Sequence, residues 1–252
     1  MDILSTNRLV KDFSGVRALS DVNVAVKKGN IHSLIGPNGS GKTTFFNVVT
    51  GLVPVSEGRI FFEDTEITAI RPHKRTKMGI SRTFQIPQVI PDMTCLENVM
   101  LGLHCRTKMD VGGTLFRLPF SSSFQEKSIK QRAFEVMKSV GLRRSAGLPA
   151  RDLAWVDEQL LQLARALAIE PRLLLLDEPT AGMGASETEK IKKVIKQIRN
   201  TGVTIMLVAH DIKLVMGISD WVTVLNFGRI IAEGSAEKVQ KDQKVLEAYL
   251  GQ

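Results

Sequence analysis

The most constraining feature of this sequence is a short apolar strand that runs directly into a glycine-rich loop and then into a helix. The loop is Gly36-Pro37-Asn38-Gly39-Ser40-Gly41-Lys42-Thr43-Thr44, which contains the pattern G-x-x-x-x-G-K-T. Apolar residues 31–35 precede the loop. Phe45, Val48, Val49 and Leu52 follow at helical spacing and predict a buried helix face that ends near Gly51. A chance glycine-rich turn rarely has both neighbours, so the sequence predicts a phosphate-binding P-loop.

The residue types in this loop suit phosphate chemistry. Glycines let the backbone turn so that several N–H groups point at one phosphate. The helix that follows adds the positive end of its dipole. Lys42 supplies a mobile cation for the β- and γ-phosphates, and the Thr43 hydroxyl is placed to coordinate Mg²⁺.

A second apolar strand, residues 173–176, ends in the carboxylate pair Asp177-Glu178. If this strand lies in a parallel sheet, both carboxylates reach the edge where ligands bind in open α/β folds. Asp177 would then hold Mg²⁺, and Glu178 would polarise an attacking water as general base. An Asp-Glu pair alone is more often a solvated turn, but joined to a P-loop it predicts nucleotide hydrolysis.

The rest of the pattern predicts strands alternating with helices. The expected strands lie within residues 3–10, 22–26, 58–62, 79–84, 203–208 and 221–225. The expected helices lie within residues 95–142, 159–169, 186–199 and 212–216, with a loop-like break at Val111–Ser123. This alternation favours a parallel α/β sheet covered on both faces.

Composition excludes some classes of protein and leaves others open. The 252 residues contain no run of about 18 apolar residues and no secretory signal pattern. Cys95 and Cys105 offer neither a disulfide framework nor metal-ligand spacing, which favours free thiols and a cytoplasmic location. The net charge of +8 suits nucleic acid or an anionic membrane surface. Its basic clusters are short and lack interleaved aromatic residues, so solvated surface charge explains each of them better.

Lys42, the Asp177-Glu178 pair and His210 at the end of a strand together resemble the nucleotide-binding subunit of an ABC transporter. The resemblance extends along the whole chain and implies ATP and Mg²⁺ as cofactors. It places Phe13 against the adenine ring, Gln85 near Mg²⁺ and the attacking water, and His210 at the γ-phosphate. Catalysis would then rest on Glu178, His210, Gln85 and Lys42, and metal binding on Thr43, Gln85 and Asp177.

The resemblance also implies an architecture. We expect a single ABC ATPase domain over residues 1–252, with an α/β P-loop NTPase core and an N-terminal antiparallel β subdomain in residues 1–85 and 159–252. A helical subdomain would be inserted at residues 86–158.

Four segments narrow the resemblance to the ATPases of branched-chain amino acid (LIV-type) importers: residues 80–85, 93–99, 213–220 and 247–251. This chain looks like the longer of the two ATPases in such systems, and the insertion Val111–Phe124 fits that assignment. The resemblance implies transmembrane permease subunits as partners and an extracytoplasmic binding protein as an indirect one. It implies no nucleic-acid partner and a peripheral position on the cytoplasmic face of the cell (inner) membrane. Ile86–Asp92 is the segment expected to dock the permease.

One segment departs from the family. The signature L-S-G-G-Q, which faces the P-loop of a second subunit, appears here as Leu153-Ala154-Trp155-Val156-Asp157. Ala154 replaces the serine, Val156 replaces the second glycine, and Gly184 stands where many relatives carry an aspartate that couples the two sites. We therefore expect two unequal ATP sites and favour a heterodimer with a second ATPase subunit.

The sequence leaves three other functions open. The chain resembles the ATPases of lipid or lipopolysaccharide export systems in motif spacing. A soluble ABC protein acting on nucleic acid or ribosomes usually has two ATPase units or a long coiled coil, and neither is found here. A hydrolytically weak regulatory subunit would fit the poor signature but not Glu178 and His210.

Overall fold

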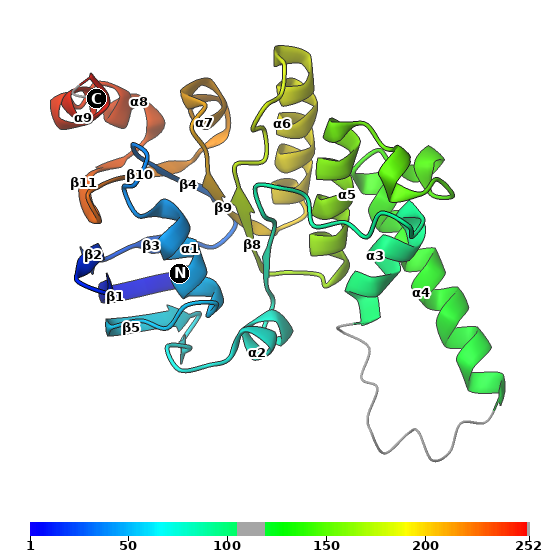
Figure 1. Cartoon of the computed structure of the whole chain (residues 1–252). Helices are drawn as coiled ribbons and strands as arrows, with labels where there is room; N and C mark the ends of the chain where they lie inside the picture. Colours follow the sequence, from blue (N-terminus) through cyan, green and yellow to red (C-terminus); the bar gives the residue numbers. More distant parts are fainter. Residues whose placement is uncertain (105–118, 251–252) are drawn as a thin grey trace. The chain divides into compact units, whose positions relative to one another are not determined.

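The computed structural model describes residues 1–104 and 119–250, which form two compact units (Figure 1). The first unit comprises Met1–Gln85 and Arg172–Gln252, and the second comprises Ile86–Pro171. Cys105 and residues 111–118 of the expected loop lie outside the described residues.

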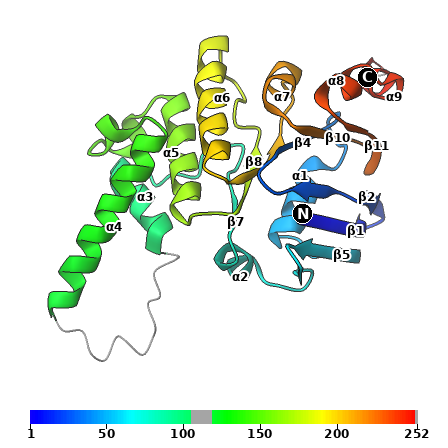
Figure 2. The ribbon, with the colours of Figure 1, turned by 180° about the vertical axis from the view of Figure 1, so that it is seen from behind.

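A six-stranded sheet with the order β11-β10-β4-β9-β8-β7 forms the centre of the first unit (Figure 2). The strands are β4 (Ile31–Ile35), β7 (Ile80–Arg82), β8 (Leu173–Asp177), β9 (Thr204–Val208), β10 (Trp221–Asn226) and β11 (Arg229–Gly234). All neighbours pair in parallel except β10 and β11. Every residue of β4, β8 and β9 is buried, as expected for strands covered on both faces. Their carboxyl ends therefore share one edge.

A second, antiparallel sheet confirms the expected N-terminal β portion. Its order is β2-β1-β5-β6, with β3 also paired to β1. The strands are β1 (Asp2–Phe13), β2 (Val16–Val22), β3 (Ala25–Lys27), β5 (Glu57–Phe62) and β6 (Thr65–Glu66). One apolar cluster joins residues of both sheets through helix α1 (Lys42–Thr50), so the P-loop helix is anchored on two sides.

Helix α1 differs in one respect from the expected pattern. Phe45, Val48 and Val49 are fully buried, but Leu52 is 52% exposed. The helix stops at Gly51, which takes φ 77° as its C-cap, so Leu52 leaves the buried face. Phe46, adjacent to Phe45, is buried instead because the helix is covered by both sheets.

Five further helices complete the first unit: α2 (Pro72–Lys77), α6 (Ala185–Asn200), α7 (Ile212–Ile218), α8 (Ala236–Gln240) and α9 (Gln243–Leu250). Helix α6 buries one apolar stripe at helical spacing, formed by Ile191, Val194, Ile195 and Ile198. Strand β11 and helices α2, α8 and α9 were not expected; the three helices have only six, five and eight residues.

The second unit is helical and longer than predicted. It contains α3 (Cys95–His104), α4 (Pro119–Ser139), α5 (Trp155–Ala168) and two 3₁₀ turns, Arg143–Ser145 and Ala150–Asp152. The unit runs to Pro171, whereas the predicted subdomain ends at residue 158, because α5 packs within the unit. A Cβ on Gly102 of α3 would lie 2.7 Å from the Arg165 carbonyl oxygen, which shows how closely the two helices approach. Residues 119–123, expected as loop, are helical.

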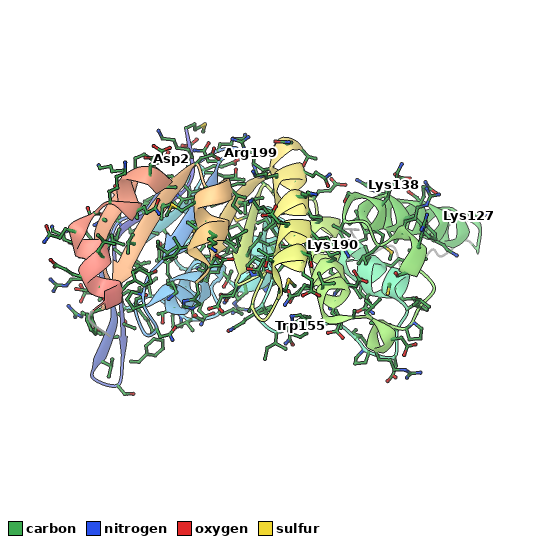
Figure 3. All side chains as sticks on the ribbon, turned by 90° about the horizontal axis from the view of Figure 1, so that it is seen from above. Asp2, Lys127, Lys138, Trp155, Lys190 and Arg199 are labelled. Carbon is green, nitrogen blue, oxygen red and sulfur yellow. The ribbon has the colours of Figure 1, made fainter. Side chains whose placement is uncertain are left out.

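The basic clusters are not all solvated. The cluster Arg143-Arg144 is exposed as expected, and the isolated Lys127 and Lys138 also project from α4 (Figure 3). Arg75, in the cluster His73-Lys74-Arg75, is the exception, because it is only 3% exposed. Its guanidinium donates to the carbonyl oxygens of Val48 and Val49 at the end of α1 and to those of Thr68 and Ile70. It therefore satisfies carbonyl groups that a helix end leaves unpaired.

Among the described residues, no helix is both long enough and apolar enough to cross a membrane.

Because His32 on β4 is buried, we expect the free energy of unfolding to depend on pH. His32 is 1% exposed, and burial lowers its pKa from 6.5 to about 4. Between these values the unfolded chain binds a proton that the folded chain does not, so the free energy of unfolding falls as the pH drops. We expect His32→Gln to reduce the slope of the free energy of unfolding against pH by up to about 1.4 kcal/mol per pH unit. Urea unfolding at several pH values measures it.

The exposed His73 provides the matched control, since His73→Gln should keep the wild-type slope. An identical slope in wild type and His32→Gln would contradict the assignment.

Candidate active site

The P-loop connects the end of β4 to the start of α1 in a conformation that only glycine tolerates. Gly36 and Gly41 have φ values of 151° and 107°. A Cβ on Gly36 would lie 2.0 Å from the Leu225 carbonyl oxygen, and one on Gly41 would lie 2.6 Å from that of Ala18. Neighbouring backbone, as well as the turn itself, therefore excludes larger residues at both positions.

Lys42 lies inside this loop. It is 5% exposed, and its Nζ donates to the carbonyl oxygens of Gly36 and Pro37 at 2.7 and 2.8 Å. Burial lowers the pKa of Lys42, while Glu178 and Asp177 act in the opposite direction. Helix α1 has no acidic residue in its first turn, so its N-terminal dipole is uncompensated by its own side chains. This donor set fits a phosphate group, with residues 36–44 as the predicted contacts.

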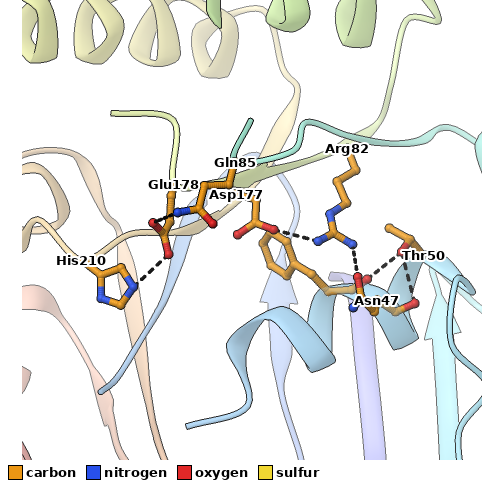
Figure 4. A network of polar contacts seen from close by, with 8 residues as sticks. Asn47, Thr50, Arg82, Gln85, Asp177, Glu178 and His210 are labelled. Atoms are coloured by element: carbon orange, nitrogen blue, oxygen red, sulfur yellow. Dashed lines mark hydrogen bonds and ion pairs between the residues drawn. The ribbon is translucent and has the colours of Figure 1, made fainter. Parts of the chain in front are cut away.

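Glu178, directly after β8, joins two other segments (Figure 4). Its Oε1 lies 2.8 Å from His210 Nε2, and its Oε2 accepts a 2.9 Å hydrogen bond from Gln85 Nε2. The Glu178 backbone N–H donates to the Val208 carbonyl oxygen at 2.8 Å, which ties it to the end of β9. Three predicted residues, distant in sequence, thus meet at one carboxylate.

This geometry suits general-base chemistry. Both Glu178 oxygens are oriented by hydrogen-bonding partners, and the side chain is 16% exposed, so water can reach it. His210, at 42% side-chain exposure, is accessible to a ligand from the same edge. A carboxylate held in this way can take a proton from a water that is also contacted by Gln85.

Asp177 is the last residue of β8 and is 5% exposed. Its Oδ2 accepts a 2.7 Å hydrogen bond from the Arg82 guanidinium. Carboxylate, hydroxyl and amide oxygens are the ligands that Mg²⁺ prefers, usually alongside phosphate oxygens. Asp177, Thr43 and Gln85 therefore could hold the metal together with a bound nucleotide.

The remaining predicted contacts are described by their own local structure. Phe13 ends β1, is 43% exposed, and has the Lys11 ammonium 4.7 Å from its ring centroid. In the second unit, Ala154 is the N-cap of α5 without a side-chain cap, and Asp157 lies in the first turn. The roles of Phe13 and of the signature residues 153–157 stay predictions.

Residues that the motifs did not single out also reach the P-loop and Asp177. Arg82 contacts Asp177, and Asn47 contacts Arg82. Burial raises the pKa of Tyr249 on α9, and the Gly36 backbone near its hydroxyl acts in the opposite direction. Arg82 and Tyr249 lie in the segments 80–85 and 247–251, which resemble the family. This resemblance is the sequence signal that could have identified them.

Comparison with known proteins decides the family. A family model described as ABC transporter matches residues 19–181, and one described as branched-chain amino acid ATP-binding cassette transporter matches residues 229–252. This chain belongs to the ABC transporter family. The predicted family and fold class are confirmed, and the ABC ATPase is an enzyme that couples ATP hydrolysis to transport.

Relatives of this ABC ATPase match it over nearly their full length. The high-affinity branched-chain amino acid transport ATP-binding protein LivG of Escherichia coli K12 is 37% identical over 99% of this chain and 98% of the relative. The crystal structure of the ADP conformation of MJ1267, an ATP-binding cassette of an ABC transporter, has a TM-score of 0.87 and 34% identity, with 100% of both chains covered. The dimeric cassette MJ0796 bound to ADP and Pi has a TM-score of 0.78 and 27% identity over 92% of this chain and 98% of that chain.

Glu178→Gln tests the carboxylate at the centre of the site. The amide cannot accept the proton of an attacking water, so we expect ATP turnover to fall by about 10²- to 10⁴-fold while ATP binding persists. Phosphate release by the chain alone, and by the chain assembled with its transporter partners, measures turnover; fluorescent ATP measures binding.

Glu63→Gln is the matched control, because Glu63 and Glu178 both have a positive φ, 51° and 47°, and the Glu63 carboxylate also has a side-chain partner, Arg172. It should leave turnover near wild type. Retention of full turnover in Glu178→Gln would rule out Glu178 as the base.

Proposed function

We propose that this chain is the ATP-binding and hydrolysing subunit that powers an ABC importer for branched-chain or related amino acids. The names of its relatives and the match at residues 229–252 support this cargo class. The observation that carries the enzymatic part is Glu178, held between Gln85 and His210 beside Asp177. ATP with Mg²⁺ is the proposed substrate complex.

Each side chain has a distinct part in the proposed reaction. Lys42 and the P-loop N–H groups bind the β- and γ-phosphates and balance their charge. Mg²⁺ supplies charge neutralisation at the phosphates. Glu178 accepts a proton as water attacks the γ-phosphorus, Gln85 orients that water, and His210 contacts the γ-phosphate. Breaking the β–γ bond releases phosphate and leaves ADP.

The proposed docking surface for the permease is the segment Ile86–Asp92, at the start of the helical unit. Ile86 is 67% exposed and Ile90 is 37% exposed, so apolar side chains face solvent. Asn98 is fully buried and bonds the backbone N–H and C=O of Ile90 at 2.8 and 3.0 Å. Gln162 accepts a 3.3 Å bond from the Gln88 N–H. A loop pinned by side chains in this way costs little ordering entropy when a partner binds.

The signature segment supports a second, different ATPase subunit as partner. The first turn of α5 carries Asp157 and Glu158, and its N-cap Ala154 offers no hydroxyl. These carboxylates compete with a partner's γ-phosphate for the positive end of the α5 dipole. Val156 also places a Cβ where a phosphate would have to approach the backbone closely. A homodimer would carry this poor signature in both sites, whereas a heterodimer would carry it in one.

The rival functions are less well supported. Lipid or lipopolysaccharide export differs from amino acid import in the cargo and in the permease. A regulatory, hydrolytically weak subunit would not need Glu178 oriented by two partners. The proposed location is the cytoplasmic face of the cell membrane, reached through the permease, with the extracytoplasmic binding protein as an indirect partner and no nucleic acid.

Reconstitution of the assembled transporter tests the proposed function. We expect co-purification with two permease subunits and ATP-dependent uptake of radiolabelled leucine into proteoliposomes when the binding protein is present. Ile86→Asp should abolish both, because it puts a charge in an apolar contact. Val16→Asp, at a residue 68% exposed on β2, is the matched control and should retain both. Co-purification with a lipid-export permease would contradict the proposal.

Restoring the signature tests the unequal sites. The double variant Ala154→Ser with Val156→Gly should raise turnover of the assembled complex by several-fold, of the order that one γ-phosphate hydrogen bond supplies. Ala154→Ser alone should give part of the gain. Thermal unfolding checks the stability cost, because Val156 is only 9% exposed and its replacement by glycine removes a buried side chain as well as helix propensity. Unchanged turnover in a stable double variant would show that backbone N–H groups suffice.

A further inference from the structure

Arg82 connects the metal-binding end of the site to the P-loop helix. It is the last residue of β7, and its side chain is only 6% exposed. One terminal nitrogen donates to Asp177 Oδ2 at 2.7 Å, and the other donates to Asn47 Oδ1 on α1 at 2.6 Å (Figure 4). One guanidinium therefore bridges β8 and α1, the two elements that carry the proposed metal contacts Asp177 and Thr43.

Two aromatic rings hold the guanidinium in place. Its central carbon lies 5.5 Å from the centroid of the Phe46 ring and 5.0 Å from that of the Phe84 ring. Arg82 Nε is the one buried side-chain nitrogen or oxygen among the described residues without a hydrogen-bond partner. Leaving a buried donor unpaired is unfavourable. The position of the guanidinium is therefore set by its two terminal bonds and the rings rather than by any bond at Nε.

We propose that Arg82 is a positioning residue that orients the Asp177 carboxylate toward Mg²⁺ and fixes its place relative to the P-loop helix through Asn47. The proposal rests on the proposed function, which places Mg²⁺ at Asp177. With Oδ2 bonded to Arg82, the carboxylate cannot rotate freely, and Oδ1 remains for the metal or its water.

The positive charge of Arg82 cannot by itself explain a favourable effect on Mg²⁺ binding. A guanidinium bonded to a metal ligand repels the metal ion, so through its charge alone Arg82 weakens Mg²⁺ binding. A net benefit has to come from geometry, because Mg²⁺ tolerates little departure from octahedral coordination. Residues that orient metal ligands typically contribute 10- to 100-fold to metal affinity.

The test is the Mg²⁺ dependence of nucleotide binding by the full chain, followed with fluorescent ATP. Arg82→Met keeps an unbranched side chain between the rings and removes both hydrogen bonds. We expect that the Mg²⁺ concentration giving half of the maximal effect on nucleotide binding rises about 10-fold or more. Binding in EDTA, which reports the P-loop alone, should stay within about 2-fold. Arg82→Lys should restore part of the loss, and Asn47→Ala should give a smaller rise in the same direction.

Arg172→Met is the matched control. Arg172 also stacks on an aromatic ring, that of Phe62 at 5.2 Å, and pairs with a carboxylate, that of Glu63 at 2.6 Å. It should leave the Mg²⁺ dependence at wild type.

Three results would overturn the proposal: an unchanged Mg²⁺ dependence in both Arg82→Met and Asn47→Ala, a stronger Mg²⁺ effect in Arg82→Met, or an equal loss of binding in EDTA. A wild-type chain whose nucleotide binding ignores Mg²⁺ would instead contradict the proposed function, so the two failures are distinguishable.

Discussion

The parallel pairing of β4, β9 and β8 is the constraint on which the candidate site depends. Each strand buries all five of its residues, so covering layers are needed on both faces. Parallel pairing sends the three carboxyl ends to one edge. The P-loop follows β4, the carboxylates end β8, and His210 follows β9. The pairing of the strands is therefore enough to bring these groups to the same edge.

The two adjacent carboxylates at this edge have different bonding partners. Asp177 is buried and bonded to Arg82, whereas Glu178 is partly exposed and bonded to Gln85 and His210. Two adjacent carboxylates can therefore keep different roles, one as a metal ligand and one as a base. Lys42 is buried against carbonyl oxygens of its own loop, which are weaker partners than the phosphates it is proposed to bind.

The segments of interest in the helical unit are proposed to contact other subunits rather than to take part in the reaction at Glu178. Helix α5 presents an N-terminus with two acidic residues, and the first segment of the unit presents exposed isoleucines on a backbone held by Asn98 and Gln162. In the proposed function, both features act on another subunit. The P-loop and the strand before Asp177 could be predicted from short windows of sequence, whereas Gln85 and His210 were predicted from the family resemblance, by their order and spacing around the P-loop.

The sequence by itself determined the P-loop, the carboxylate pair and the alternation of strands and helices, since each depends on residues adjacent in the chain. Only the tertiary structure decided which distant side chains meet. Arg82 is separated from Asn47 by 35 positions and from Asp177 by 95, and no periodicity links them. The same holds for Arg75, buried because it caps α1, and for α5, which joins the helical unit through Gly102. Such contacts are set by how elements pack, and packing is a property of the whole chain.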